Sequence, residues 1–74
     1  MPDFDHVEYI FDAKPDDEVL ERFERLGLDH GFAGEWYVFK GALAPREAYN
    51  ARRYVDSLRK KMPDNNIMEH HLTV

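Results

Sequence analysis

Three segments of the chain have the pattern of β-strands, and the first covers residues 4–13. Within it Val7, Tyr9 and Phe11 alternate with polar side chains, although Ile10 interrupts the alternation. A period of two residues is typical of a strand that buries one face and exposes the other. The pattern therefore predicts a half-buried strand.

The strongest tendency to form a strand lies in residues 35–43. Apolar side chains from Trp36 to Phe39 occupy both alternating sets, which predicts a central strand that is covered at least in part on both faces. A final strand is predicted from residue 67 to residue 74. On that strand we expect Met68, Leu72 and Val74 to face the core, with His70 half-buried beside them.

The first helix is predicted over residues 16–26. Pro15 suits a first helical position, and the acidic side chains that follow suit the positive end of the helix dipole. Gly27 is expected to be left-handed at the end, so that Leu28 returns onto Phe23 in a Schellman motif. The buried stripe is predicted to consist of Val19, Leu20, Phe23 and Leu26.

A second helix is predicted over residues 45–62, with Pro45 as its first residue. The segment between the first helix and the central strand, residues 29–34, is predicted as a loop because it holds two glycines, with a very short strand and turn as the alternative. The second helix repeats apolar residues at steps of three and four: Ala48, Ala51, Val55, Leu58 and Met62.

The resulting order is β-α-β-α-β, with a short additional strand near residues 28–33 as an alternative. A chain of 74 residues is too short to cover both faces of a sheet with helices, so it predicts two layers. We expect a single α+β domain over residues 1–74, with two helices packed on one face of a sheet of three or four strands. Right-handed connections favour a ferredoxin-like (split βαβ) arrangement.

The residue composition removes several classes of function. The chain has no cysteine, which excludes disulfides and thiolate metal sites and suits the cytoplasm. Ser57 and Thr73 are the only aliphatic hydroxyls, and no phosphate-binding glycine loop or HExxH motif is present. No apolar run exceeds four residues, so no membrane span is expected. The four histidines have no metal-ligand spacing. We therefore expect a protein that is not an enzyme and has no metal or cofactor.

The net charge of −5 is distributed unevenly along the chain. Residues 1–35 hold eleven acidic and three basic side chains, a net charge of −8, whereas residues 36–74 hold four and seven, a net charge of +3. The overall acidity argues against direct binding of nucleic acid, which depends on lysine and arginine. The folded chain should have an acidic and a basic surface, or two surfaces that neutralise each other.

The leading hypothesis is a small acidic inhibitor or regulator that binds a basic surface of a larger nucleic-acid-handling protein. Carboxylates pair with arginine in the geometry that phosphates also use, so an acidic face can take the place of a nucleic acid. In size, charge and element order, and not in any sequence motif, the chain is similar to small acidic inhibitors of ribonucleases and to phage-encoded inhibitors of host defence complexes. The expected contact residues are Asp16, Asp17, Glu21, Glu24, Asp29, Trp36 and Tyr37.

Two alternatives remain at this level. The first is a module that binds RNA or an acidic partner through the basic second helix, where Arg46, Tyr49, Arg53 and Lys60 share an outward side. The second is a small enzyme or ligand-binding subunit with Asp29 and His30 at the rim of a pocket in the 29–34 loop. The ten aromatic residues also suggest an exposed patch on an open sheet face, used for partner binding or for a homodimer.

Overall fold

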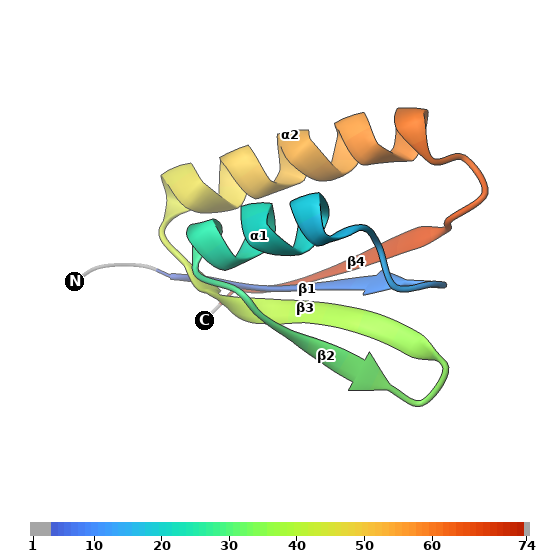
Figure 1. Ribbon diagram of the computed structural model, residues 1–74. Helices are drawn as coiled ribbons and strands as arrows, with labels where there is room; N and C mark the ends of the chain where they lie inside the picture. Colours follow the sequence, from blue (N-terminus) through green and yellow to red (C-terminus); the bar gives the residue numbers. More distant parts are fainter. Residues whose placement is uncertain (1–3, 74) are drawn as a thin grey trace.

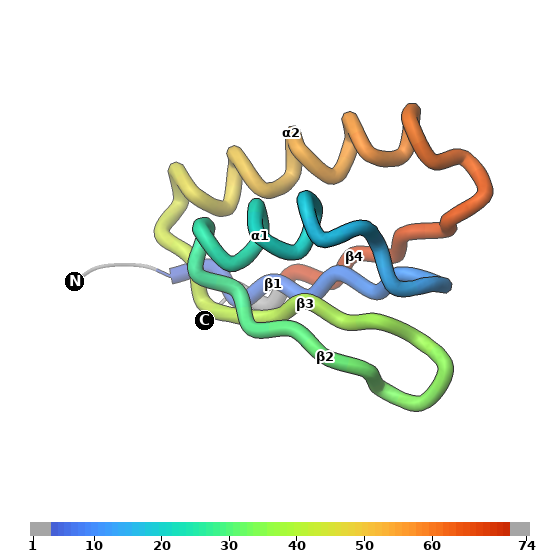
Figure 2. The backbone as a smooth tube through the Cα atoms, viewed as in Figure 1, coloured from blue at the N-terminus to red at the C-terminus, as the bar shows by residue number. Residues whose placement is uncertain are grey.

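A computed structural model describes residues 4–73 of the chain. Neighbouring strands are antiparallel, and their order across the sheet is β2-β3-β1-β4. Both helices lie on the same side of this sheet (Figures 1 and 2). The prediction of an α+β chain with two helices and a sheet of three or four strands is therefore confirmed, and the sheet has four strands. The elements are β1 (Asp5–Phe11), α1 (Asp17–Leu26), β2 (Asp29–Ala33), β3 (Trp36–Leu43), α2 (Pro45–Lys61) and β4 (Ile67–Thr73).

The segment predicted as a loop is an edge strand, β2, so the alternative of a short strand and turn is the one that holds. Ala33 pairs with Trp36, which leaves a two-residue hairpin turn of Gly34 and Glu35. Gly34 has a φ of 65°, while no residue other than glycine has a positive φ in the described part of the chain. A glycine with positive φ at the first turn position is typical of a type II′ hairpin.

Both helices begin and end near the predicted residues, because their signals are local. Gly27 has a φ of 96° and ends α1, and the backbone N–H of Leu28 donates to the carbonyl of Phe23. This bond is the one that defines the Schellman motif, so that prediction is confirmed. Pro45 is the first residue of α2, as predicted, and the helix ends one residue earlier than expected, at Lys61.

The core lies between the helices and one face of the sheet, and Phe23 of α1 is at its centre. Its ring lies 4.3 Å from the ring of Phe39 and 5.3 Å from that of Tyr54, measured between centroids. Tyr9 and Phe11 of β1 also contact Phe23 and are fully buried. These aromatic contacts join α1, α2 and the two central strands into one core.

Strand β4 faces the core with the set of side chains opposite to the one predicted. Ile67 pairs with Phe11 of β1 and is buried, whereas Met68 and His70 are exposed on the other face. The expectation that Met68 and a half-buried His70 face the core is therefore wrong, because the register with β1 assigns the faces. The predicted core positions of the Leu72 and Val74 side chains lie outside the described part of the molecule.

The central strands leave one face of the sheet without a helix, which we call the open face. Ile10 of β1 and Val38 of β3 pair with each other there and are half-buried. This placement explains why Ile10 interrupts the alternation of β1. Strand β3 is an inner strand, and its open face is covered only in part, as expected. Within residues 4–73, no helix is both long enough and apolar enough to cross a lipid bilayer.

Candidate functional site: the acidic flank of α1 and the β2 edge

Three carboxylates of α1 lie on one flank of the helix, and we call them the acidic stripe: Asp17, Glu21 and Glu24. They stand at positions i, i+4 and i+7, a spacing that places side chains in a line along one side of a helix. Glu24 contacts His30 on β2, so this flank faces the β2 edge of the sheet. The Glu24 end of the acidic stripe therefore points away from α2, whereas Glu21 also borders a groove that Tyr54 and Lys61 of α2 line.

The opposite flank of α1 faces α2 and carries a cation. The guanidinium of Arg22 lies 5.1 Å from the centroid of the Tyr54 ring of α2. None of the ion pairs among residues 4–73 joins α1 to α2. The acidic helix and the basic helix thus do not neutralise each other through direct salt bridges. Asp16, Asp17 and Glu21 are exposed, and none of them has an ion-pair partner in the described residues.

Glu24, the third member of the acidic stripe, is held by a hydrogen-bond chain. Its Oε1 atom lies 2.7 Å from Nε2 of His30, whose Nδ1 lies 2.5 Å from the hydroxyl of Tyr37. A neutral imidazole protonated at Nε2 satisfies both contacts, because it donates to the carboxylate and accepts from the phenol. These hydrogen bonds link the end of α1 to β2 and β3, so Glu24 has a structural role in addition to its charge.

Phe32 of β2 adds an apolar side chain to this edge and was not among the predicted site residues. It pairs with Tyr37, packs edge-on against that ring at 4.9 Å between centroids, and remains 66% exposed. Paired residues of neighbouring strands share a sheet face, so Phe32 lies on the face that α1 covers. Large aromatic side chains exposed at this level are typical anchors of protein interfaces.

The remaining predicted contact residues do not gather with the acidic stripe. Tyr37 is only 5% exposed and is part of the core, so it cannot be the exposed anchor that was expected. Trp36 is 49% exposed but lies on the open face, because adjacent residues of a strand point to opposite faces. Asp29 is on the open face as well, opposite Lys40.

The same alternation separates Asp29 from His30. The 29–34 segment is a strand followed by a turn, so these two side chains project from opposite faces of the sheet. Both ring nitrogens of His30 are already engaged by Glu24 and Tyr37. Both residues nevertheless line one small hollow along β2, as the enzyme alternative predicted. They reach it from opposite faces of the sheet, and the nitrogens of His30 are not free there.

The basic surface of α2 is present as predicted. Arg46, Tyr49, Arg53 and Lys60 are all exposed, and the guanidinium of Arg53 lies 5.8 Å from the centroid of the Tyr49 ring. Arg59, on another side of the helix, donates to the carbonyl of Ile67 at 2.9 Å and to Asp56 at 3.1 Å. Arg59 thus joins β4 to α2 by a hydrogen bond. The four predicted residues remain on the surface.

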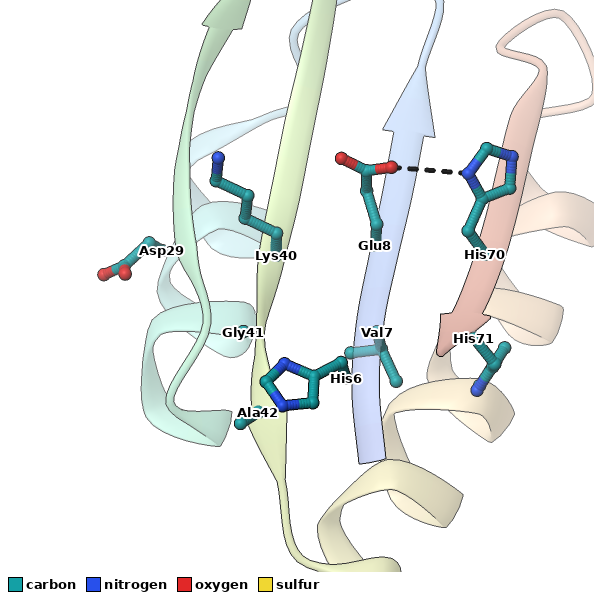
Figure 3. Close-up of a pocket in the computed structure, with 9 residues that line it drawn as sticks. All are labelled: His6, Val7, Glu8, Asp29, Lys40, Gly41, Ala42, His70 and His71. Atoms are coloured by element: carbon teal, nitrogen blue, oxygen red, sulfur yellow. Dashed lines mark ion pairs between the residues drawn. The ribbon is translucent and has the colours of Figure 1, made fainter. Parts of the chain in front are cut away.

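The open face carries a row of polar side chains across all four strands (Figure 3). The residues, in order from β2 to β4, are Asp29, Lys40, Glu8 and His70, each paired with the next across neighbouring strands. Glu8 Oε1 lies 3.4 Å from Nδ1 of His70. These side chains, with His6 and Ala42, line a shallow depression on the sheet. Within residues 4–73 no three histidine, aspartate or glutamate side chains are placed to hold a metal ion together.

One polar atom in the core has no partner. The hydroxyl of Tyr9 is buried and makes no hydrogen bond to any described residue. Burial raises the pKa of Tyr9 to about 12, and the nearby Glu69 carboxylate acts in the same direction. Burial also raises the pKa of Tyr54. Neither hydroxyl lies on the acidic stripe, and neither enters the proposed site.

No protein-family model, curated protein or solved structure matches this chain.

Proposed function

We propose that this protein is a non-enzymatic binding domain that recognises a basic surface of a protein partner through the acidic flank of α1. The observation that carries the proposal is that the acidic stripe is exposed and that no ion pair among residues 4–73 joins it to α2. Asp17 and Glu21 are exposed there without an ion-pair partner among the described residues. Their charges are therefore available to a cation from outside the chain.

The edge of the sheet supplies two further features that support a protein partner. Phe32 offers an exposed aromatic anchor on the same sheet face as α1. Strand β2 has a neighbour on one side only, so its outer backbone groups are unpaired within the sheet. An acidic stripe beside an aromatic anchor and a strand edge suits a basic protein segment better than it suits a small molecule.

The class of partner we propose is a nucleic-acid-handling protein, which the domain would inhibit or regulate by occupying its basic surface. Carboxylates on a rigid helix can form the bidentate pairs with arginine that phosphates form. We keep the cytoplasm as the proposed location, because a chain without cysteine suits a reducing compartment.

The strand order supports a ferredoxin-like (split βαβ) arrangement, which is known from many binding modules. Helix α1 connects β1 to β2 with β3 inserted between them, and α2 connects β3 to β4 with β1 inserted. Two split βαβ units of this kind define that arrangement. We propose it as the topology of this chain, and it carries no function by itself.

A comparison of three baits tests the proposed function. The baits are the wild-type chain, an acidic variant (Asp16→Asn, Asp17→Asn, Glu21→Gln) and a basic variant (Arg46→Gln, Arg53→Gln, Lys60→Gln). Each variant removes three exposed charges of one sign, so the two control for each other. Partners are captured from a lysate of the native host and identified by mass spectrometry.

We expect a basic protein to be captured by the wild-type chain and the basic variant and to be lost with the acidic variant. Equal capture by the acidic variant would refute the proposal. Loss with the basic variant alone would support a second candidate, a module that binds RNA or an acidic partner through α2. The exposed Arg53–Tyr49 stack favours that candidate, because such pairs occur at protein and nucleic-acid interfaces.

A further inference from the structure

The open face of the sheet carries an apolar row beside the polar row described above. Its members are paired across the strands in the order Gly31, Val38, Ile10 and Met68. Met68 is 44% exposed, and no helix covers this face in the described structure. Trp36 extends the apolar surface at one end of β3. This surface lies on the opposite side of the sheet from α1, so it is separate from the proposed binding flank.

The polar row alternates along its length between carboxylates and side chains that carry nitrogen. From β2 to β4 it presents a carboxylate (Asp29), an ammonium group (Lys40), a carboxylate (Glu8) and an imidazole (His70) (Figure 3). The order is informative because β1 and β3 are the two inner strands of the sheet. A symmetry operation that places β1 of one copy over β3 of a second copy also places β2 over β4. The polar rows of the two copies then run in opposite directions.

A two-fold axis that runs parallel to the strands, between β1 and β3, performs this operation. It would bring two open faces together with Lys40 over Glu8 of the second copy and Glu8 over Lys40 of the second copy. Asp29 would face His70 of the second copy, and Val38 would face Ile10. Lys40 and Glu8 then each meet a group of opposite charge, Asp29 meets an imidazole that can donate a hydrogen bond to it, and the apolar rows meet each other. An axis perpendicular to the strands would instead place each charge over the same residue of the second copy.

We infer that the open face is the interface of a homodimer with this two-fold axis. Isologous contacts of this kind require a surface that is complementary to itself, and the two rows meet that requirement. Aligned packing of two sheets about 10 Å apart is a common arrangement, so the apolar side chains can interdigitate.

The size of the face also fits a dimer. Four strands about 4.8 Å apart and about seven residues long give a face of roughly 19 Å by 23 Å in projection. This projected area of about 440 Å² lies at the small end for protein interfaces, whose stable members bury at least ~600 Å² per partner, so we expect a weak dimer that forms at high concentration. In this dimer both helical layers point outward, which leaves the two acidic stripes free.

Sedimentation velocity over micromolar to millimolar concentrations tests the inference. The wild-type chain should reach about twice its monomer mass of 8.8 kDa as concentration rises. Lys40→Glu and Glu8→Lys should each raise the dimer Kd about tenfold or more, because each places like charges opposite each other at two symmetric positions. The two variants mixed in equal amounts should form a heterodimer, because the two carboxylates of the first variant then face the two ammonium groups of the second.

Controls separate loss of the interface from loss of the fold. Val38→Glu, at the centre of the apolar row, should abolish the dimer while the circular dichroism spectrum stays unchanged. Lys60→Glu makes the same charge change on α2 and should leave the dimer intact. A chain that remains monomeric at every concentration overturns the inference. So does a dimer that withstands both single charge reversals and Val38→Glu, because it must use another surface. Neither outcome bears on the acidic stripe.

Discussion

Two buried tyrosines on neighbouring strands provide a matched pair for a stability experiment. The hydroxyl of Tyr9 has no hydrogen-bond partner in the described structure, whereas that of Tyr37 contacts Nδ1 of His30 at 2.5 Å. Both residues lie in the core, with exposed fractions of 0% and 5%. Replacement by phenylalanine removes one oxygen atom in each case, so the difference between the two variants reports on the hydrogen bond.

The expected magnitudes follow from the two environments. A buried polar group without a partner costs about 1–3 kcal/mol, so Tyr9→Phe should stabilise the fold by about 1 kcal/mol after the loss of packing around the oxygen. Tyr37→Phe removes a hydrogen bond and leaves the imidazole nitrogen unpaired, which should cost about 1 kcal/mol. For a domain of this size, 1 kcal/mol changes Tm by about 4–8 °C.

Urea unfolding monitored by circular dichroism measures both free energies at neutral pH. We expect a difference of about 2 kcal/mol between the variants, with opposite signs relative to the wild-type chain. An unchanged slope m would show that both still unfold from the same native state. A Tyr9→Phe variant that is less stable than the wild type would overturn this expectation, because the hydroxyl would then have a favourable partner.

Three further predictions concern residues of the same core and the hydrogen bond that joins β4 to α2. Because the folded pKa of Tyr9 is raised from 10.0 to about 12, the native state holds its proton more tightly, and the free energy of unfolding should fall by about 2 kcal/mol as pH rises from 10 to 12. Unfolding of wild type and Tyr9→Phe at alkaline pH checks this, since the variant should lose less stability. Phe23→Ala should cost about 3–5 kcal/mol, a large part of the stability of so small a domain, and a melting curve without a cooperative transition would agree. Arg59→Met should cost about 1–2 kcal/mol through loss of the hydrogen bond to the Ile67 carbonyl, and hydrogen exchange should increase in β4 but not in β2.

The elements that the sequence predicts well are those whose signals are local. Helix α1 is bounded by the acidic first turn and by Gly27, and capping chemistry depends only on nearby residues. The spacing of Asp17, Glu21 and Glu24 already places these three on one side of the helix. Which side faces α2 depends on the topology of the sheet, and the sequence alone does not specify it.

The errors share a non-local cause. In β4 both alternating sets contain apolar residues, so only the pairing of Ile67 with Phe11 decides which set is buried. The same holds for Trp36 and Tyr37, where pairing with β1 and β2 sends the tyrosine inward. Phe32 could have been found from the alternation of His30 and Phe32 around Gly31, but the glycines of that segment favoured a loop.

The proposed function depends on the binding of a basic partner by the unpaired carboxylates of α1. Isothermal titration calorimetry of the captured partner, at increasing sodium chloride concentration, measures the Kd of this binding directly. For the wild-type chain we predict that Kd rises steeply with salt, and that Asp17→Asn combined with Glu21→Gln weakens binding at low salt and flattens this dependence. An affinity that depends neither on salt nor on these two carboxylates would rule out recognition through the acidic stripe.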